Sequence, residues 1–482
     1  MAGEGTNEAL TSLAERTASS APSAVLLPAG FLWGAATSAY QIEGSTAVDG
    51  RGESIWDTFS HTPGRVHNGE TGDVAIDHYR LMDADVELMG RLGLRAYRFS
   101  VAWPRVIPQG RGAVNQAGLD FYRRLVDRLL ESGIEPMPTL YHWDLPEALQ
   151  REGGWTARST AHAFATYAAV VGDALADRDT SFLTLNEPWC AAFLGYASGV
   201  HAPGIRNPES AVRATHHLLL AHGLALEELR TAGVSEVGIT LNLFAVSPAT
   251  DSEEDRAAAR AVDGLQNRLF LDPILKGSYP EDVLATFSRI CDLSVIQSGD
   301  LSTISAPIDI LGVNYYTRHT VTAAPKSPAE GASQWVGAES NGLVEPEGAT
   351  TEMGWPVDAD GLAEVLIQVS RDYDAPPMMI TENGAAYDDV VNDQGIVDDS
   401  ERIAFLDAHI AAVKGAIDWG VDVRGFFVWS LFDNFEWAQG YSKRFGIVYV
   451  DYANQRRLFK ASALWYRDLI SRHTADLGDD ES

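Results

Sequence analysis

Residues 423–429, Val-Arg-Gly-Phe-Phe-Val-Trp, form an almost uninterrupted apolar run with the length of a β-strand. Ahead of this run, apolar side chains at positions 403, 406, 410, 413 and 417 recur at steps of three and four residues, which predicts an amphipathic helix that ends at Gly420. Because the run does not alternate between apolar and polar residues, we expect a parallel strand that is covered on both faces. The segment is therefore one helix–strand unit.

The same unit recurs along the chain. Seven further apolar, β-branched or aromatic runs are separated by segments of helical periodicity, and they lie at residues 31–37, 96–101, 135–141, 181–186, 237–243, 308–315 and 377–381. Eight alternating units predict an α/β protein, a single-domain (β/α)8 TIM barrel in which residues 325–352 form a long βα loop and residues 249–256 a short acidic loop. The alternative is an open doubly wound sheet, which needs a glycine-rich phosphate loop after its first strand. Residues 38–44 read Ser-Ala-Tyr-Gln-Ile-Glu-Gly instead.

We expect the barrel to occupy residues 28–473. Residues 1–27 are rich in Ala, Ser and Thr and carry glutamates where a signal peptide would have its apolar run. This composition predicts a disordered N-terminal tail and a cytoplasmic protein. Residues 474–482 are expected to form an acidic C-terminal tail.

Charge and cysteine content exclude several classes of protein. The chain holds 36 Lys and Arg against 67 Asp and Glu, a net charge of −31, which would repel the phosphates of nucleic acids and the surface of anionic membranes. No run of about 18 apolar residues occurs, so no membrane span is expected. Cys190 and Cys291 are too few for a disulfide framework and lack CxxC spacing. No sequence feature indicates an oligomeric state.

Polar and aromatic side chains lie on or just after the expected strands, near the rim where a barrel places its catalytic groups. They are Gln41, Glu43, Arg98, His142, Trp143, Asp144, Asn186, Glu187, Asn314, Tyr315, Tyr316, Glu382, Asn383, Trp429, Glu436 and Trp437. Two carboxylates at the ends of different strands suggest acid–base or nucleophilic chemistry on an acetal. The indoles and amides indicate a sugar, because a pyranose stacks on an indole and its hydroxyls bind amides and carboxylates. A single glutamate at a strand end is more often a capping or ion-pairing residue. The prediction therefore depends on the coincidence of Glu187, Glu382 and Arg98 with the Trp, Asn and Gln side chains.

Three motifs resemble those of glycoside hydrolase family 1. Residues 31–44, Phe-Leu-Trp-Gly-Ala-Ala-Thr-Ser-Ala-Tyr-Gln-Ile-Glu-Gly, are similar to the N-terminal signature of that family. Residues 184–188, Thr-Leu-Asn-Glu-Pro, are similar to its acid/base motif, and residues 380–384, Ile-Thr-Glu-Asn-Gly, to its nucleophile motif. The motifs occur in the family's order. The resemblance implies a (β/α)8 fold and hydrolysis of β-glycosides with retention of configuration.

The resemblance also implies roles for single residues. Glu382 is expected to be the nucleophile, and Glu187 the general acid and then the general base. Arg98 matches the arginine beside the nucleophile and would hold Glu382 ionised, while the nearby negative charge would raise the pKa of Glu187. Tyr316 matches the tyrosine whose hydroxyl binds the nucleophile. Retention requires the two carboxyl groups to be about 5–5.5 Å apart.

The sugar pocket follows from the same resemblance. The residues that match the hydroxyl-binding set of the family are Gln41, His142, Asn186, Glu436 and Trp437. Trp429 matches the indole floor under the ring, and Trp143 and Asn314 complete the candidates. Trp355 resembles the indole on the aglycone side, with a plain core tryptophan as the alternative. The expected substrate is a small-molecule β-glucoside, including cello-oligosaccharides, and no cofactor is expected.

Alternative substrates depend mainly on Glu436. Relatives that act on 6-phosphosugars usually carry a small polar residue at this position, and a carboxylate repels a phosphate dianion, so free glucosides are favoured. The cations Lys443 and Arg444 keep a 6-phospho-β-glucosidase as a less favoured alternative. The nearer alternative is a β-galactosidase or β-fucosidase of broad specificity.

Two rivals come from other classes. A catalytically silent sugar-binding relative would have lost one glutamate, and this chain keeps both. A metal-dependent barrel isomerase needs a ligand cluster, but His216 and His217 point about 100° apart on a helix and His222 is also poorly spaced. No HExxH or CxxC motif is present, so no metal site is expected.

Overall fold

The computed structural model describes residues 27–178, 180–324 and 333–479, and its centre is a closed parallel barrel. The eight strands are β1 (Leu32–Ala36), β2 (Ala96–Ser100), β3 (Glu135–Tyr141), β4 (Phe182–Asn186), β5 (Val237–Asn242), β7 (Ile310–Asn314), β10 (Met378–Asn383) and β11 (Val423–Trp429). They close in the order β1-β11-β10-β7-β5-β4-β3-β2, and every neighbouring pair is parallel. The predicted (β/α)8 barrel is confirmed, and the doubly wound alternative is wrong.

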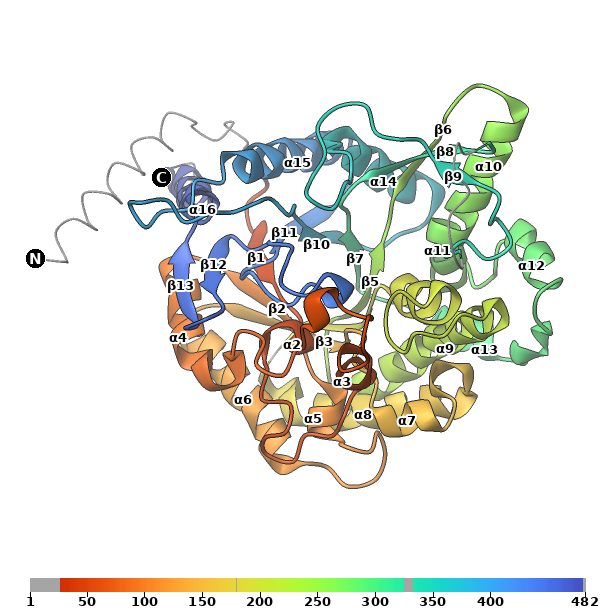
Figure 1. The fold of residues 1–482 in the computed structure, drawn as a ribbon, viewed down its shortest axis with the longest axis horizontal. Helices are drawn as coiled ribbons and strands as arrows, with labels where there is room; N and C mark the ends of the chain where they lie inside the picture. The colour runs from red at the N-terminus through yellow and green to blue at the C-terminus, as the bar shows by residue number, and fades with distance from the viewer. Residues whose placement is uncertain (1–26, 179, 325–332, 480–482) are drawn as a thin grey trace, which may run out of the picture.

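Helices follow each barrel strand and cover the outside of the barrel (Figure 1). The principal helices are α4 (His78–Arg91), α6 (Gln116–Glu131), α8 (Arg158–Leu175), α9 (Pro208–Thr231), α10 (Glu253–Asp263), α11 (Leu269–Leu275), α12 (Glu281–Phe287), α13 (Asp300–Ile304), α14 (Ala359–Asp372), α15 (Ser400–Asp418) and α16 (Ala461–Asp479). Shorter helical turns are α2 (Ala39–Ile42), α3 (Ile55–Ser60), α5 (Trp103–Val106), α7 (Glu147–Arg151), η1 (His67–Gly69), η2 (Gly154–Thr156), η3 (Ala176–Arg178), η4 (Cys190–Ser198), η5 (Gly264–Arg268), η6 (Leu293–Val295) and η7 (Trp437–Gln439). The helix expected before Gly420 is α15, and its periodic residues Ile403, Leu406, Ile410 and Val413 are buried.

Apolar side chains from the strands fill the inside of the barrel. The members of this buried cluster on the strands are Ala36, Ala96, Met137, Leu183, Ile310, Met379, Phe427 and Trp429. Gly34 lies beside them. A larger residue would not fit at this position, because a Cβ would come within 2.5 Å of the Phe427 ring. The interior is thus a packed core, which leaves the carboxyl ends of the strands as the place for polar groups.

Two small sheets, which the sequence analysis did not predict, extend the barrel. β6 (Ala245–Pro248), β8 (Arg318–Thr322) and β9 (Gly342–Leu343) form one sheet, and β12 (Val448–Asp451) and β13 (Arg456–Phe459) form an antiparallel pair. Because β9 pairs with β8, the stretch 325–352 is not wholly a loop. Residues 325–332 of that stretch lie outside the described residues.

The acidic stretch 249–256 is also only partly a loop, because α10 begins at Glu253. The Ser252 hydroxyl accepts a hydrogen bond from the Asp255 N–H at 3.1 Å and caps the helix. The acidic residues of the first turn suit the positive end of the helix dipole.

The two ends of the described chain pack against each other. His473 Nε2 lies 3.1 Å from the carbonyl oxygen of Leu27, and Trp33 Nε1 donates to His473 Nδ1 at 3.3 Å. Leu27, the last residue of the expected N-terminal tail, is therefore buried. Helix α16 continues across the expected domain end at residue 473. Residues 1–26 and 480–482 of the expected tails lie outside the described residues.

Candidate active site

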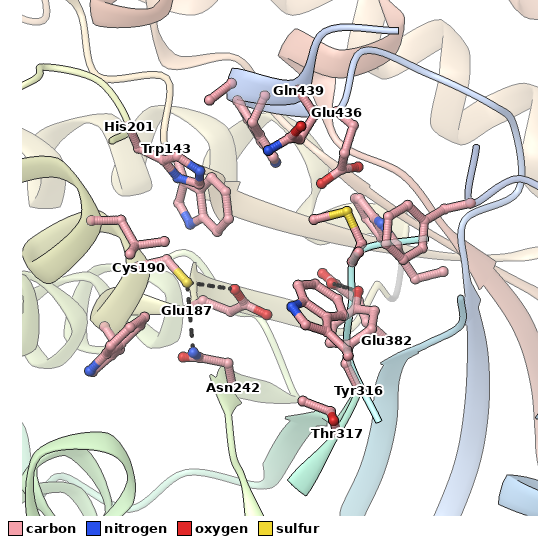
Figure 2. A pocket seen from close by; sticks show the side chains of 18 of the residues that line it. Trp143, Glu187, Cys190, His201, Asn242, Tyr316, Thr317, Glu382, Glu436 and Gln439 are labelled. Carbon is pink, nitrogen blue, oxygen red and sulfur yellow. Dashed lines mark hydrogen bonds between the residues drawn. The ribbon is translucent and has the colours of Figure 1, made fainter. Parts of the chain in front are cut away.

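A cavity of about 270 Å³ opens at the carboxyl ends of the barrel strands (Figure 2). The candidate residues that line it are His142, Trp143, Glu187, Tyr316, Trp355, Glu382, Trp429, Glu436 and Trp437. The remaining candidates, Gln41, Arg98, Asn186 and Asn314, are buried behind this lining and bind residues that belong to it.

Glu187 follows β4 directly, in an unusual backbone conformation. Its φ is 46°, in the left-handed region that non-glycine residues rarely adopt. Its N–H still donates to the carbonyl oxygen of Thr240 in β5 at 3.0 Å, so the turn begins without loss of the contact between strands. Helix η4 begins three residues later at Cys190. Strained backbone of this kind concentrates at functional sites.

Glu382 lies inside β10, one residue beyond the expected end of that strand at residue 381. The pairing with β7 shifts register between Ile380 and Glu382, and the strand continues to Asn383. At Gly384 a Cβ would lie 1.7 Å from the carbonyl oxygen of Trp429. Glycine is therefore required for the close approach of the Glu382 segment to the end of β11.

Both carboxylate oxygens of Glu382 accept strong hydrogen bonds. Arg98 Nη1 donates to Oε1 at 2.6 Å, and the Tyr316 hydroxyl donates to Oε2 at 2.7 Å. The guanidinium is itself fixed, because Nε donates to Thr139 Oγ1 at 3.1 Å and Nη2 donates to Asn186 Oδ1 at 2.7 Å. The cation thus lies beside Glu382 in a fixed orientation.

Glu187 has neutral partners instead. Asn314 Nδ2 donates to Oε1 at 2.7 Å, and the Cys190 thiol donates to Oε2 at 3.1 Å. Burial, and secondly the charge of Glu382, raise the pKa of Glu187 to about 7. The carboxyl is therefore half protonated near neutral pH.

The two carboxyl groups are electrostatically coupled, and their environments differ. Burial raises the pKa of Glu382 above its usual value, but Arg98 and the Tyr316 hydroxyl oppose that rise. The cation favours ionisation of Glu382, and the resulting charge favours protonation of Glu187. An ionised carboxylate and a protonated carboxyl in one buried cavity can attack an acetal carbon and protonate its leaving oxygen.

His142 presents a free hydrogen-bond donor. Asn186 Nδ2 lies 3.0 Å from His142 Nε2, and because an amide nitrogen only donates, Nε2 accepts and the proton resides on Nδ1. His142 Nδ1 is buried and has no partner within the described residues. Burial, followed by the charge of Arg98, lowers the pKa of His142 well below its usual value, so the ring is neutral.

Glu436 supplies a third carboxyl at the cavity, and this residue is half-buried. Gln41 Nε2 donates to its Oε2 at 3.4 Å and also to the carbonyl oxygen of Phe435 at 2.9 Å. Burial, followed by the charges of Glu382 and Glu187, raises the pKa of Glu436 to about 8. Glu436 is expected to repel a phosphate group through its negative charge. It carries this charge only when the pH is above about 8.

Indoles enclose the same end of the cavity. The His142 ring is nearly parallel to Trp429 and Trp437, with centroid distances of 5.6 and 5.9 Å. Trp143 packs against Trp437 at 4.6 Å and donates from Nε1 to the carbonyl oxygen of Asn186 at 3.0 Å. These rings provide the flat apolar surface that a pyranose face needs.

Trp355 lines the cavity rather than the core alone. Its ring packs against Tyr316 at 5.6 Å and against Phe445 at 6.2 Å. It lies beside Tyr316, whose hydroxyl binds Glu382 at 2.7 Å.

The cations considered for a phosphate are already paired. Lys443 Nζ binds Glu352 Oε2 at 3.3 Å, and Arg444 Nη1 binds Asp433 Oδ2 at 2.6 Å. Neither residue is among those that line the cavity. Both ion pairs weaken the phosphate alternative.

The three histidines of α9 bind separate partners. His216 contacts Asp300 and Tyr279, His217 contacts the carbonyl oxygen of Trp155, and His222 contacts Thr184. Among the residues that the structure describes, no group of three or more His, Cys, Asp or Glu side chains is placed to hold a metal ion. No helix of the described chain combines the length and apolar character needed to cross a membrane.

Several lining residues were not among the sequence candidates. They are Trp189, Cys190, Leu194, His201, Asn242, Phe244, Thr317, His319, Gln334, Met353, Ala438, Gln439 and Phe445. They lie in loops, short helices and strands near the carboxyl ends of the barrel strands, and most of them belong to no motif that the sequence analysis recognised. Cys190 and Asn242 were the most accessible to sequence reasoning, because one follows Glu187 by three residues and the other ends β5.

Comparisons with known proteins agree with this geometry. The sequence profile described as "Glycosyl hydrolase family 1" matches residues 24–475. "Thermostable beta-glucosidase B" of Thermobispora bispora is 53% identical over 457 residues, which cover 95% of this chain and 93% of that protein. "Bifunctional beta-D-glucosidase/beta-D-fucosidase" of Bifidobacterium breve is 48% identical over 464 residues, 94% of this chain and 99% of that protein. The solved structure "Family 1 b-glucosidase from Thermotoga maritima" superposes with a TM-score of 0.89 at 48% identity and covers 94% of this chain and 99% of its own.

Proposed function

The chain belongs to glycosyl hydrolase family 1, and we propose that it is a retaining β-glucosidase, which removes terminal non-reducing β-D-glucosyl residues from small glycosides and cello-oligosaccharides. The observation that carries the proposal is the pair of buried carboxyls at one cavity. Glu382 is held by the Arg98 cation, while Glu187 keeps neutral partners and a pKa raised to about 7. Double displacement needs this division of roles.

In the first step, a carboxylate oxygen of Glu382 attacks the anomeric carbon and forms a glycosyl ester. The bond to the leaving oxygen breaks, and Glu187 gives its proton to that oxygen. Attack removes the negative charge of Glu382, so the pKa of Glu187 falls. Glu187 then takes a proton from the water that hydrolyses the ester.

The neighbouring side chains suit a glucosyl ring in this cavity. Asn186 Nδ2 uses one hydrogen on His142 and keeps a second for a sugar hydroxyl, a contact that we assign to the 2-hydroxyl. His142 Nδ1 supplies another donor, and the carboxyl of Glu436 supplies acceptors. Trp429 forms the floor on which the ring stacks.

A second candidate is a β-glucosidase with β-fucosidase or β-galactosidase activity. The name of the Bifidobacterium breve relative joins glucosidase and fucosidase, which supports this breadth. Gln41 and Glu436 would bind the hydroxyls in which these sugars differ. Hydrolysis of 6-phosphoglucosides is disfavoured, because Lys443 and Arg444 are paired to carboxylates.

A cytoplasmic role in the breakdown of cellulose fragments is the corresponding cellular proposal. Cys190 and Cys291 are both free thiols, as suits a reducing compartment. Cell fractionation with an antibody against the chain tests the location.

The decisive experiment is a comparison of nitrophenyl β-glucoside, β-galactoside, β-fucoside and 6-phospho-β-glucoside on one preparation, with the first product followed by proton NMR. We expect the highest kcat/KM on the glucoside and initial release of β-glucose. Initial release of α-glucose would overturn the retaining assignment. A 6-phosphoglucoside preference would overturn the substrate assignment.

A further inference from the structure

The acid/base candidate Glu187 is held on both of its oxygens by side chains of different character. Oε1 accepts from the Asn314 amide at 2.7 Å. Oε2 faces the Cys190 thiol at 3.1 Å (Figure 2). Asn242 Nδ2 lies 3.6 Å from the same sulfur and fixes it from the end of β5. Cys190 and Asn242 both line the cavity.

We propose that Cys190 is a positioning residue for Glu187, whose thiol holds Oε2 and so selects this oxygen as the one that carries and delivers the catalytic proton. The inference rests on the proposed acid/base role of Glu187. It assigns a function to a residue for which no motif of the chain gives a role.

The two partners of Glu187 differ in their capacity to donate and to accept a hydrogen bond. An amide nitrogen only donates, so the Asn314 contact disfavours a proton on Oε1. A thiol is a weak donor and a weak acceptor, and it therefore tolerates Oε2 both with and without a proton. When Glu187 is a carboxylate, the S–H donates to Oε2. When Glu187 is protonated, the sulfur can accept from Oε2 until a substrate oxygen takes its place.

The thiol keeps its own proton throughout. Burial, and secondly the charge of Glu187, raise the pKa of the Cys190 thiol well above its usual value. The proton that reaches the leaving oxygen therefore comes from Glu187, and the S–H then stabilises the carboxylate that remains. In this state the thiol contact lowers the pKa of Glu187, against the rise that burial causes.

Other charged or titratable groups also act on Glu187, and they come from several elements. Glu382 on β10 raises its pKa, and Arg98 on β2 lowers it. Tyr316 after β7 and Glu436 after β11 line the same cavity, and burial raises the pKa of both. Because none of them changes in a Cys190 variant, the effect of the thiol can be isolated.

The first test is the pH profile of kcat/KM for an aryl β-glucoside in Cys190→Ala and Cys190→Ser. In Cys190→Ala the carboxylate of Glu187 loses a hydrogen bond, so the pKa of Glu187 should rise. The alkaline limb of the pH profile should therefore move to higher pH by about 0.5–1 unit. Cys190→Ser keeps a donor, and its limb should stay near that of the parent protein. Equal limbs in all three proteins would overturn the proposal, since a purely structural thiol would change rates without moving the limb.

The second test needs no turnover and works even if the Ala variant folds poorly. In a Cys291→Ser background Cys190 is the sole thiol, and Cys291 is not among the residues that line the cavity. Replacing Glu187 by Gln removes the adjacent charge, so the thiol pKa should fall and alkylation by iodoacetamide at pH 8 should accelerate at least about fivefold. An unchanged alkylation rate would show that the thiol and the carboxyl are not coupled.

Failure of the proposed function and failure of the Cys190 role give different results. If the proposed function is wrong, the parent protein will not hydrolyse β-glucosides. If only the role of Cys190 is wrong, the parent protein will turn over normally while the pH limb and the alkylation rate stay unchanged in the variants.

Discussion

Arg98 and Glu382 form an ion pair at 2.6 Å in which the side chains are only 1% and 4% exposed. Neither charge can be solvated by bulk water, so each depends on the other and on the neighbouring hydrogen bonds. The Arg98–Glu382 pair keeps a carboxylate ionised in a cavity where burial alone would favour the protonated acid. This arrangement supports the proposed role of Glu382 as the nucleophile.

A 2-deoxy-2-fluoro glucoside with a good leaving group should label Glu382 covalently. The fluorine slows both displacements, and the good leaving group lets the first one proceed, so the glycosyl ester accumulates. Peptide mapping by mass spectrometry should find the label on the peptide that contains Glu382, and Glu382→Gln should remain unlabelled. A label on another residue of an active preparation would refute the assignment.

Glu187→Ala should reduce kcat/KM by about 10²–10⁴-fold on glucosides with poor leaving groups, because these need a proton from the acid. Activated aryl glucosides should lose far less in the first step. Added azide should restore turnover of the activated substrates and yield the β-glucosyl azide, since a small anion needs no general base. Equal losses on both substrate types, without an azide adduct, would show that Glu187 does not transfer the proton.

Above about pH 8, where Glu436 is ionised, Glu436→Ser should lower kcat/KM for glucosides by roughly 30- to 1,000-fold, because two charge-assisted hydrogen bonds to hydroxyls are lost. The ratio of 6-phosphoglucoside to glucoside turnover should rise, because the repulsion of phosphate is removed as well. In the parent protein this ratio should fall as the pH rises through about 8, the pKa to which burial raises Glu436. If Glu436 only ties its loop together, all substrates will fall by the same factor and the ratio will not move.

The raised pKa of Glu187 also predicts a pH-dependent stability. The carboxyl has a pKa of about 7 in the fold against a reference of 4.5, so its contribution to stability is fully present below pH 4.5 and is lost as the pH rises through about 7. Glu187→Gln removes this titration. Urea unfolding should therefore show the variant gaining on the order of 2 kcal/mol over the parent protein between pH 4 and pH 8. Parallel stability curves for the two proteins would contradict the raised pKa.

The barrel could be predicted because its strands are read from a local pattern. The run 423–429 coincides with β11 at both ends, since it is apolar except for Arg424 and Gly420 ends the preceding helix. The predicted run 377–381 ends two residues before β10 does, because Glu382 and Asn383 are polar and do not continue the apolar pattern. They remain in the strand only because the β10–β7 pairing shifts register, which is a property of two strands and not of one sequence.

The site could be predicted only where residues belong to motifs or strand ends. Arg98, Glu187, Tyr316 and Glu382 come together because parallel strands place their carboxyl ends on one rim. The Cys190 contact had no such signal, because it depends on the left-handed turn at Glu187. The small sheets β6-β8-β9 and β12-β13 also had no signal in the sequence. Their strands are only two to five residues long, and they depend on partners elsewhere in the chain.

The contact between Gln41 and Glu436 joins positions 395 residues apart. β1, which precedes Gln41, pairs with both β2 and the last barrel strand β11. The ribosome therefore synthesises Gln41 early and Glu436 only after a further 395 residues have been added. A nascent chain that stops before β11 has unpaired strand edges and no complete pocket. The pocket can thus bind a sugar only after Glu436 has been synthesised. Ligand binding therefore distinguishes chains that contain β11 and Glu436 from shorter ones.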